Sequence, residues 1–375
     1  MIYFDSGATT LEKPRTVRQA MARAVNTMSS PGRGSHQATQ LAEETDYACR
    51  AAAAKLFGVA DESNVIFTGN ATHGLNIAIH TLVQPGSRVV ISGYEHNAVT
   101  RPLHAIPNVT LTVLDTPPFQ PERMVEELKA ALAQGADVVI CNHVSNVFGC
   151  VQPVEEMAAL CAEAGVPFLL DASQSAGILP VRMDTLHAAF IAMPGHKGLY
   201  GPQGTGLLLC NHEAAPLLYG GTGSLSKLQT MPDMLPDRLE SGTHNMPGIA
   251  GLLEGIRYVQ RTGVETIAAH ERRLTAQAVA LLRQTEGIRL FWRDGLRHQT
   301  GVLSFVVEGV DCEELGEALA RQGIALRAGL HCAPLAHRTV GTLKTGTVRF
   351  SPSAFNTSQQ VVQFAQILQR TIRKM

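Results

Sequence analysis

The chain has 375 residues, 45% of them hydrophobic and 17% charged, a composition that is typical of a globular protein and excludes a disordered or fibrous one. Lys and Arg total 31 against 32 for Asp and Glu, so there is no excess charge to attract a nucleic acid or an anionic membrane, and we expect neither partner. Seven cysteines without a CxxC pair, no leader peptide and no apolar run long enough to span a bilayer predict a cytoplasmic protein.

Short apolar runs alternate with helical patterns through the first 210 residues. Runs of this kind are typical of strands buried on both faces of a sheet. The clearest helical patterns, at 37–57, 121–133 and 153–164, are each followed closely by a glycine that would end the helix. This alternation predicts an α/β fold, with a mainly parallel sheet and helices on both faces. The strand candidates are 65–68, 88–92, 110–114, 137–141, 167–171, 188–193 and 205–210.

The pattern changes after residue 210. Residues 219–247 are rich in Gly, Met and Pro and show little periodicity, so we expect a functional loop or an arm between subunits. The rest mixes helices and strands as an α+β domain does. Because one core rarely supports 375 residues, we predict a large domain at 15–250 and a smaller one made of 1–14 and 251–375. The later helices are expected at 248–262, 264–285, 312–323 and 357–371, and the later strands at 302–309 and 347–353.

Polar residues directly after predicted strands are candidate ligand contacts, because open parallel sheets bind ligands at the carboxyl ends of their strands. Residues 69–74 lead from a strand into a helix, so that free backbone N–H groups and the Thr72 hydroxyl could hold a phosphate. The alternative is an ordinary helix cap. Other strands are followed by His96, by Asn146, and by Asp171 and Gln174, none of which identifies a site alone.

The sharpest single signal is Lys197, inside the Gly-rich segment 195–206. Glycines on both sides would leave room for a bulky planar group, and burial lowers the proton affinity of a lysine so that it becomes a usable amine. This pattern is typical of a lysine that forms a Schiff base. A P-loop is excluded because GxxxxGK[ST] is absent, whereas a Gly-rich hairpin with a solvated lysine remains the alternative.

A second candidate lies near the C-terminus, where RAGLHCAP places Cys332 beside a histidine and after an arginine. Positive neighbours favour the reactive thiolate, whereas the alternative is a buried, inert cysteine. Arg349 is either a structural ion-pair partner or the group that grips a substrate carboxylate through two hydrogen bonds. A zinc site made of His331, Cys332 and His337 lacks a typical spacing, so we predict no metal.

Eight segments match a known pattern when they are taken together: DSGATT, RGSHQAT, the stretch around His96, HVSNVFG, DASQSAG, GHKGLYGPQGTG, ESGTHN and RAGLHC. Their order and spacing resemble the class V aminotransferase family, and within it the cysteine desulfurases and selenocysteine lyases. The resemblance extends from Asp5 to Arg349, nearly the whole chain. It implies fold type I of the pyridoxal 5'-phosphate enzymes, with that cofactor and a homodimer.

The resemblance also implies roles for individual residues. Lys197 would form the Schiff base, Asp171 would pair with the pyridine nitrogen, and Cys332 would accept sulfur as a persulfide. His96 would stack on the ring and move protons, and Arg349 would bind the substrate carboxylate. The remaining contacts are Gln174 and Asn146 at the ring oxygen and substrate, Ala71, Thr72 and His196 at the phosphate, Thr243 at the phosphate from the second subunit, and Ala8 with Asn146 around the carboxylate.

The implied reaction converts L-cysteine to L-alanine and leaves the sulfur on Cys332. The segment RAGLHCAP resembles the compact form of the cysteine loop, which implies an acceptor protein that takes the sulfur away. The alternatives are a lyase that releases selenide from L-selenocysteine and a non-catalytic scaffold of the same fold. Transaminases and epimerases of this fold have no use for a nucleophilic cysteine here. A nicotinamide dehydrogenase would need GxGxxG, which is absent.

Two features depart from the family pattern. Pro194 stands where the family usually has Ser or Thr, so we expect phosphate binding to be weaker or reorganised. The segment between Gly220 and Gly242 is shorter than the usual arm, so we expect docking of a partner to differ.

Overall fold

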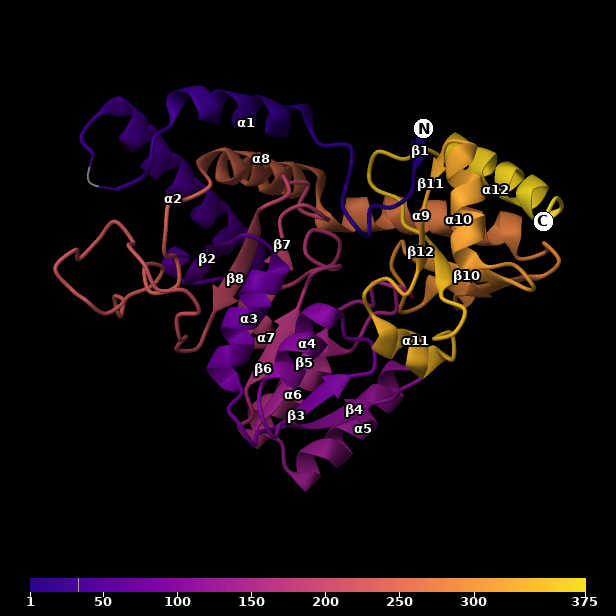
Figure 1. Cartoon of the computed structure of the whole chain (residues 1–375), viewed down its shortest axis with the longest axis horizontal. Helices are drawn as coiled ribbons and strands as arrows, with labels where there is room; N and C mark the ends of the chain where they lie inside the picture. Colours follow the sequence, from indigo (N-terminus) through magenta and orange to yellow (C-terminus); the bar gives the residue numbers. More distant parts are fainter. Residues whose placement is uncertain (33) are drawn as a thin grey trace.

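A seven-stranded sheet forms the centre of the larger part of the molecule (Figure 1). The computed structural model describes residues 1–32 and 34–375, and all seven strands predicted before residue 211 lie in this sheet. Each neighbouring pair is parallel except the two made by β8 (Gly206–Cys210), so the predicted α/β fold is confirmed. The spatial order of the strands is β2 (Val65–Thr68), β8, β7 (Phe190–Pro194), β6 (Phe168–Asp171), β5 (Val138–Asn142), β3 (Arg88–Ser92) and β4 (Thr110–Leu114).

Helices cover both faces of this sheet. On β5, Val138 and Ile140 enter one core layer, and Val139 and Cys141 enter the other, as the two-residue period of a strand requires. The predicted strands read as unbroken apolar runs for this reason. One layer contains α3 (Ala71–Leu82) and α4 (Asn97–Ala105), and the other contains α2 (Gln37–Phe57), α5 (Pro121–Gln134), α6 (Val154–Ala164), α7 (Met183–Leu186) and α8 (Met246–Thr262).

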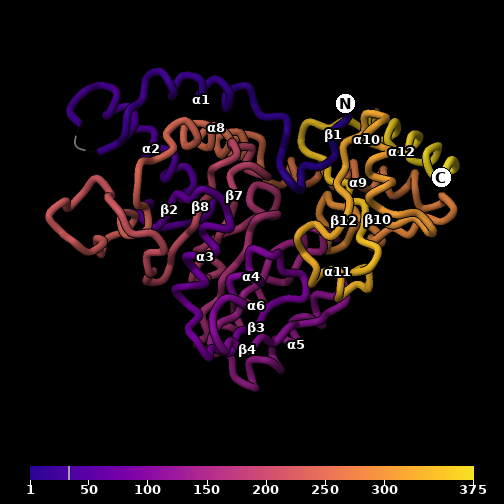
Figure 2. The backbone as a smooth tube through the Cα atoms, in the orientation of Figure 1, coloured from indigo at the N-terminus to yellow at the C-terminus, as the bar shows by residue number. Residues whose placement is uncertain are grey.

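A second, antiparallel sheet lies in the C-terminal part of the chain. Its core contains Phe4, Phe350 and Phe364, whose ring centroids lie 4.5 to 5.8 Å apart. The N-terminal strand β1 (Ile2–Tyr3) pairs with β11 (Ile324–Ala325), so both chain ends lie on this side of the molecule (Figure 2). The elements are, in spatial order, β12 (Arg327–Gly329), β13 (Thr347–Phe350), β10 (Leu303–Val307) and β9 (Ile288–Phe291), with α9 (Val264–Leu282), α10 (Cys312–Arg321) and α12 (Ser358–Ile372).

The predicted domain boundary at residues 250 and 251 falls inside α8. This helix is continuous and packs against α2 and against α1 (Arg15–Thr27), which the sequence did not predict. We therefore propose that the large domain extends to Thr262, where α8 ends. The remaining elements are α11 (Pro334–Val340) and two 3-10 turns, Glu62–Asn64 and Asp294–Leu296. None of the helices in the described ranges is long and apolar enough to cross a bilayer.

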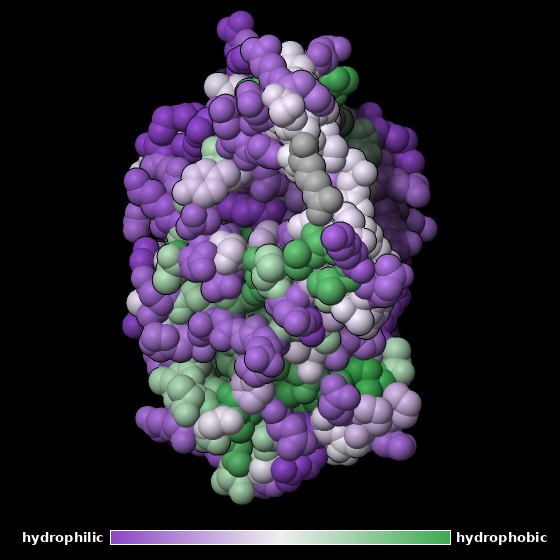
Figure 3. Space-filling view, turned by 90° about the vertical axis from the view of Figure 1, so that its left-hand side faces the viewer, coloured by the Kyte–Doolittle hydropathy of each residue, from purple (hydrophilic) through white to green (hydrophobic). Residues whose placement is uncertain are grey.

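Residues 211–245 contain no helix or strand, as expected for the Gly-rich segment, and all of them are described. Figure 3 shows the side of the molecule that carries this segment, where apolar patches lie among polar residues. Its role as an arm between subunits stays a prediction. Its exposed apolar side chains are Leu218, Tyr219, Leu225, Leu228 and Met234.

A buried charge network ties the end of this segment to α2. Arg50 donates two hydrogen bonds to Glu240, at 2.8 and 2.6 Å, and one to Asp46 at 2.8 Å. His244 lies 2.9 Å from Asp46 and 3.1 Å from Glu240. Hydrogen bonds that His244 donates to these two carboxylates raise its pKa to about 9, so the imidazole is protonated at neutral pH.

This network makes a prediction about pH and stability. The folded pKa of His244 lies above the unfolded value of 6.5, so its contribution is complete below pH 6.5 and is lost as the pH rises through 9. The free energy of unfolding should be higher for the parent than for His244→Gln. This difference between the two proteins should be about 2–3 kcal/mol larger near pH 6 than near pH 10. Urea unfolding of both proteins at each pH measures this difference. A difference that does not change with pH would rule out the raised pKa.

Candidate active site

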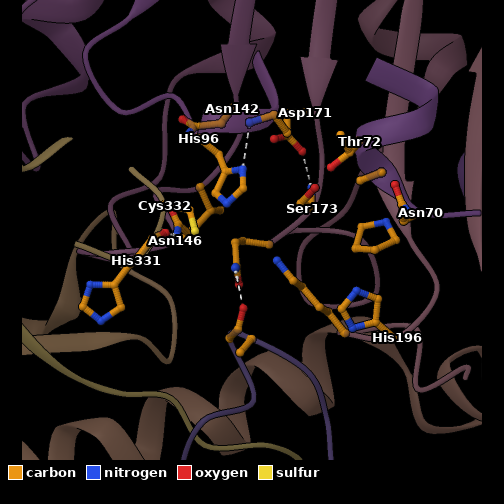
Figure 4. Close-up of a pocket in the computed structure, with 18 of the residues that line it drawn as sticks. Asn70, Thr72, His96, Asn142, Asn146, Asp171, Ser173, His196, His331 and Cys332 are labelled. Carbon is orange, nitrogen blue, oxygen red and sulfur yellow. Dashed lines mark hydrogen bonds between the residues drawn. The ribbon is translucent and has the colours of Figure 1, made fainter. Parts of the chain in front are cut away.

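A cavity of about 460 Å³ lies at the carboxyl ends of the parallel strands, between the large sheet and the C-terminal part (Figure 4). This is where open α/β sheets bind ligands. Of the twelve predicted site residues, all except Thr243 line this cavity. They are Ala8, Ala71, Thr72, His96, Asn146, Asp171, Gln174, His196, Lys197, Cys332 and Arg349.

Lys197 follows the end of β7, in a turn whose glycines allow close packing. A Cβ on Gly195 would collide with Thr205, and one on Gly198 would collide with the backbone oxygen of Ala176. The sequence-based explanation, that these glycines leave room for a planar group, was therefore wrong. Burial lowers the pKa of Lys197 to about 8, with a smaller opposing effect from Asp171, so the solvated-lysine alternative is also wrong.

Asp171 ends β6 and is 4% exposed. Its Oδ1 accepts a hydrogen bond of 2.8 Å from the backbone N–H of Ser173, which fixes the carboxylate at the top of the cavity (Figure 4). Glu95 lies in the layer behind it. Burial, reinforced by the charge of Asp171, raises the pKa of Glu95 to about 8. Of these two carboxyl groups, only that of Asp171 lines the cavity.

His96 caps the N-terminus of α4. Its Nδ1 accepts a hydrogen bond of 3.0 Å from the backbone N–H of Ala98, so the neutral ring carries its proton on Nε2. Burial and the positive charge of Lys197 lower the pKa of His96. The imidazole is therefore neutral at pH 7, with Nδ1 occupied by Ala98 and an Nε2–H that can donate a hydrogen bond to a ligand.

The start of α3 lies where the sequence predicted an anion-binding turn. Asn70 caps the helix by accepting a hydrogen bond of 2.9 Å from the N–H of His73, so the ordinary-cap alternative describes Asn70 correctly. Across this part of the cavity, Nδ1 of His196 is buried without a hydrogen-bond partner among the described residues. Helix N-termini attract anions, so the turn and His196 can hold a phosphate together. Ala71 and Pro194 contribute no hydroxyl here.

Arg349 is 2% exposed and lies on β13. It donates hydrogen bonds of 2.8 Å to the backbone oxygen of Asn146 and to Asp5, so the structural ion pair is present. Arg327 binds the other oxygen of Asp5 at 3.0 Å. Within residues 1–32 and 34–375, Nε of Arg349 and Oδ1 of Asn146 have no partner although both are buried. A buried donor and a buried acceptor thus remain for a ligand.

Cys332 lies in the loop between β12 and α11 and is the one exposed cysteine of the seven, all of which are described. The alternative of a buried cysteine is therefore wrong, and the reactivity of Cys332 stays a prediction. Both His331 and Cys332 have left-handed backbones, with φ of 52° and 54°. The loop is held by hydrogen bonds of 2.8 Å from the N–H of Asn97 to the oxygen of Cys332 and from the Asn146 side chain to the oxygen of His331.

Thr243 and His337 do not line this cavity, whereas His331 does. Thr243 is exposed and lines a separate cavity with Asp46 and Thr222, so its contribution from a second subunit stays a prediction. Arg33, the first residue of the RGSHQAT segment, lies outside the described residues. His337 hydrogen-bonds to His331 at 3.5 Å, and no group of three metal-binding side chains occurs in the described ranges. Sequence reasoning missed Asn142, Ser173 and Arg327, which lie in or beside matched segments and also line the cavity.

Three comparisons agree with this geometry. The model of the family described as aminotransferase class-V matches residues 2–364. A probable cysteine desulfurase of Mycolicibacterium paratuberculosis is 33% identical over 99% of this chain and 55% of that protein, and one of Pyrococcus abyssi is 32% identical over 100% of this chain and 95% of that protein. The chain spans 55 to 62% of the length of three such relatives. The apo structure of the cysteine desulfurase from Thermococcus onnurineus NA1 has a TM-score of 0.90 at 30% identity, covering 100% of this chain and 95% of that one.

Proposed function

Because the chain belongs to the class-V aminotransferase family, we propose that it is a pyridoxal-phosphate enzyme that converts L-cysteine to L-alanine and retains the sulfur on Cys332. One observation supports this above all. A single cavity contains an amine of lowered pKa, a buried arginine with an unpaired N–H, and the exposed cysteine. The names of the relatives and of the similar structure support the same reaction.

The cavity fits pyridoxal phosphate. Lys197 offers an amine to the aldehyde, Asp171 offers a carboxylate to the ring nitrogen, and the start of α3 with His196 offers donors to the phosphate. When bound, the cofactor would supply an aldehyde for the substrate amine and a ring that withdraws electrons from Cα. Pro194 offers neither a hydroxyl nor an N–H to the phosphate, so we expect the affinity for the phosphate to depend more on Thr72 and on Thr243 of the partner subunit.

Individual residues of the chain bind the substrate and move its protons. Arg349 holds the substrate carboxylate through its free Nε, and Asn146 accepts a hydrogen bond from the substrate through Oδ1. Lys197, whose pKa is near 8, takes the Cα proton. Cys332 is exposed, so its thiol can lose its proton to water, and the thiolate attacks the substrate sulfur, while His96 offers its Nε2–H as a hydrogen-bond donor. A bond forms between the two sulfurs as the Cβ–S bond breaks, and the electron pair of the broken bond stays on Cβ. Cβ takes a proton from water and Lys197 returns its proton to Cα, which gives alanine.

The sulfur then remains on an exposed loop, within reach of a second protein. We propose that an acceptor protein docks there and removes it. We also propose a homodimer, in which Thr243 reaches the phosphate of the other subunit. Seven cysteines without a disulfide agree with a cytoplasmic location.

The test of this function begins with the colour of the protein. The purified chain supplied with pyridoxal phosphate should turn yellow, and adding L-cysteine should give equal amounts of alanine and, with a reductant, sulfide. Lys197→Ala should lose both the colour and the reaction, because no other amine lines the cavity among the described residues. Replacing Lys129, an exposed lysine of α5, should change neither. A parent protein that stays colourless rules out the proposed function.

A further inference from the structure

A second, smaller cavity adjoins the first at Lys197. Its volume is about 30 Å³, and Gly7, Ser173, Gln174 and Lys197 line both cavities. A cavity needs about 10–15 Å³ to hold a water molecule, so this one has room for one or two. Its far wall is formed by residues that the proposed reaction does not use, namely Ser6, Thr10, Tyr200, Glu271, Thr300 and Ser351.

Glu271 is the acidic group of this cavity. It lies on α9, is 7% exposed, and within the described ranges its carboxyl has a single hydrogen bond, a long contact of 3.5 Å from Tyr200 Oη. A Cβ on Gly301 would lie 3.3 Å from its Oε2, so glycine at 301 lets the carboxyl fit. Burial raises the pKa of Glu271 to about 8, so the group is a neutral acid at pH 7.

The cavity also contains an unsatisfied hydroxyl. Oγ of Ser6 is buried and has no hydrogen-bond partner in the described part of the chain, and Ser6 as a whole is 8% exposed. A buried polar group without a partner carries a desolvation cost. Water in a polar cavity of this size removes that cost, and it can bind the carboxyl of Glu271 as well.

We propose that this cavity holds ordered water through which Glu271 exchanges a proton with the amine of Lys197. The carboxyl gives its proton to the water while the water gives one to the amine, which leaves a carboxylate and an ammonium group; the reverse step restores the neutral pair. Glu271 thereby acts on the reaction through Lys197, as a positioning residue. The inference rests on the proposed role of Lys197 as the reacting amine.

The other charged groups near Glu271 and Lys197 are the same in the parent and in Glu271→Gln. Asp171 and Asp5 raise the pKa of Lys197, whereas Arg349 and Arg327 lower it. The titratable groups that face Glu271 are Tyr200 and, farther away, Tyr258. None of these residues changes in Glu271→Gln, which keeps the size and hydrogen bonding of the neutral acid. A shift in the titration of Lys197 would therefore report the charge at position 271.

The experiment measures the amine directly in the full chain, after hydroxylamine has removed any bound cofactor. Lys197 is labelled by reductive methylation with formaldehyde at a series of pH values and quantified by mass spectrometry. Above about pH 8, where Glu271 is ionised in the parent, its charge favours the ammonium form of Lys197, so the midpoint of labelling in Glu271→Gln should lie about 0.5–1 pH unit lower. Glu271→Asp should restore most of the difference, and Glu265→Gln, an exposed position on the same helix, should have no effect.

Identical profiles for the parent and Glu271→Gln overturn the inference. If Glu271→Gln does not fold, infrared spectra of Glu95→Gln give a second test, because this variant lacks the other buried acid whose pKa is raised to about 8. The absorption of a protonated carboxyl should be present at pH 6 and should fall as the pH rises through about 8. A carboxylate already ionised at pH 6 overturns the inference. A shifted labelling profile in a protein that never binds pyridoxal phosphate would instead overturn the proposed function.

Discussion

Replacing Cys332 by serine is expected to lower the rate of alanine formation from L-cysteine at least about a thousandfold, because a hydroxyl is a poor nucleophile at neutral pH. The yellow colour and the melting temperature should not change, since Cys332 is exposed and has no side-chain hydrogen bond among the described residues. The parent should gain one sulfur atom by mass spectrometry after a single turnover with cysteine. The variant should gain none.

The other cysteines provide a control for this experiment. Six of the seven are buried, so brief treatment of the native parent with iodoacetamide should attach one group and inactivate the enzyme. Cys332→Ser should take up no label. If the variant still formed alanine and sulfide at the parent rate, Cys332 would not be the nucleophile.

The same variant separates the two candidate substrates. A selenolate is a better leaving group than a thiolate, so its release needs less help from a nucleophile. We expect Cys332→Ser to keep much more activity towards L-selenocysteine than towards L-cysteine. Parent rates that strongly favour selenocysteine would identify a selenocysteine lyase instead.

The second large effect is expected for Arg349→Lys, which should reduce kcat/KM for L-cysteine by about 10²–10⁴-fold. In the parent, the guanidinium binds the oxygen of Asn146 and Asp5 and still has Nε free for a carboxylate. An ammonium group on a flexible chain cannot reproduce this planar arrangement. Most of the loss should appear in KM, because the carboxylate is bound before and during the reaction.

Cysteamine, which lacks the carboxylate, is the matched probe for this prediction. The parent should strongly prefer L-cysteine, whereas Arg349→Lys should barely discriminate between the two amines. Arg338→Lys, at an exposed position on α11, controls for the substitution itself. An unchanged preference for L-cysteine in Arg349→Lys would exclude Arg349 as the carboxylate-binding group.

The large sheet could be predicted from the sequence almost to the residue, because strands buried on both faces are unbroken apolar runs. The run at 137–141, for example, corresponds to β5, all five residues of which are buried. Helix α1 could not be predicted in the same way. Only Val17 and Ala24 are buried in its 13 residues, so its pattern is too weak to distinguish it from a loop. Helix α11, which has only seven residues, was not predicted either.

The candidate site was predictable where its residues directly follow strands or lie in matched segments, as Asp171 and Lys197 do. Contacts between distant parts of the chain were not. The ion pair of Asp5 with Arg349 joins residues 344 positions apart, and nothing near either residue indicates the other. Glu271 is an ordinary acidic residue of a helical pattern in the sequence. Its burial beside Lys197 depends on Gly301 and on the packing of α9.

The ion pair of Asp5 with Arg349 also constrains biosynthesis. Asp5 is translated long before β13, since Arg349, which β13 carries, lies 344 residues later in the chain. Strand β1 can likewise pair only after β11 has been made. A nascent chain therefore contains Lys197 long before it contains the arginine that we propose to bind the substrate carboxylate. Until β13 has been translated, the ion pair that orients this arginine cannot form.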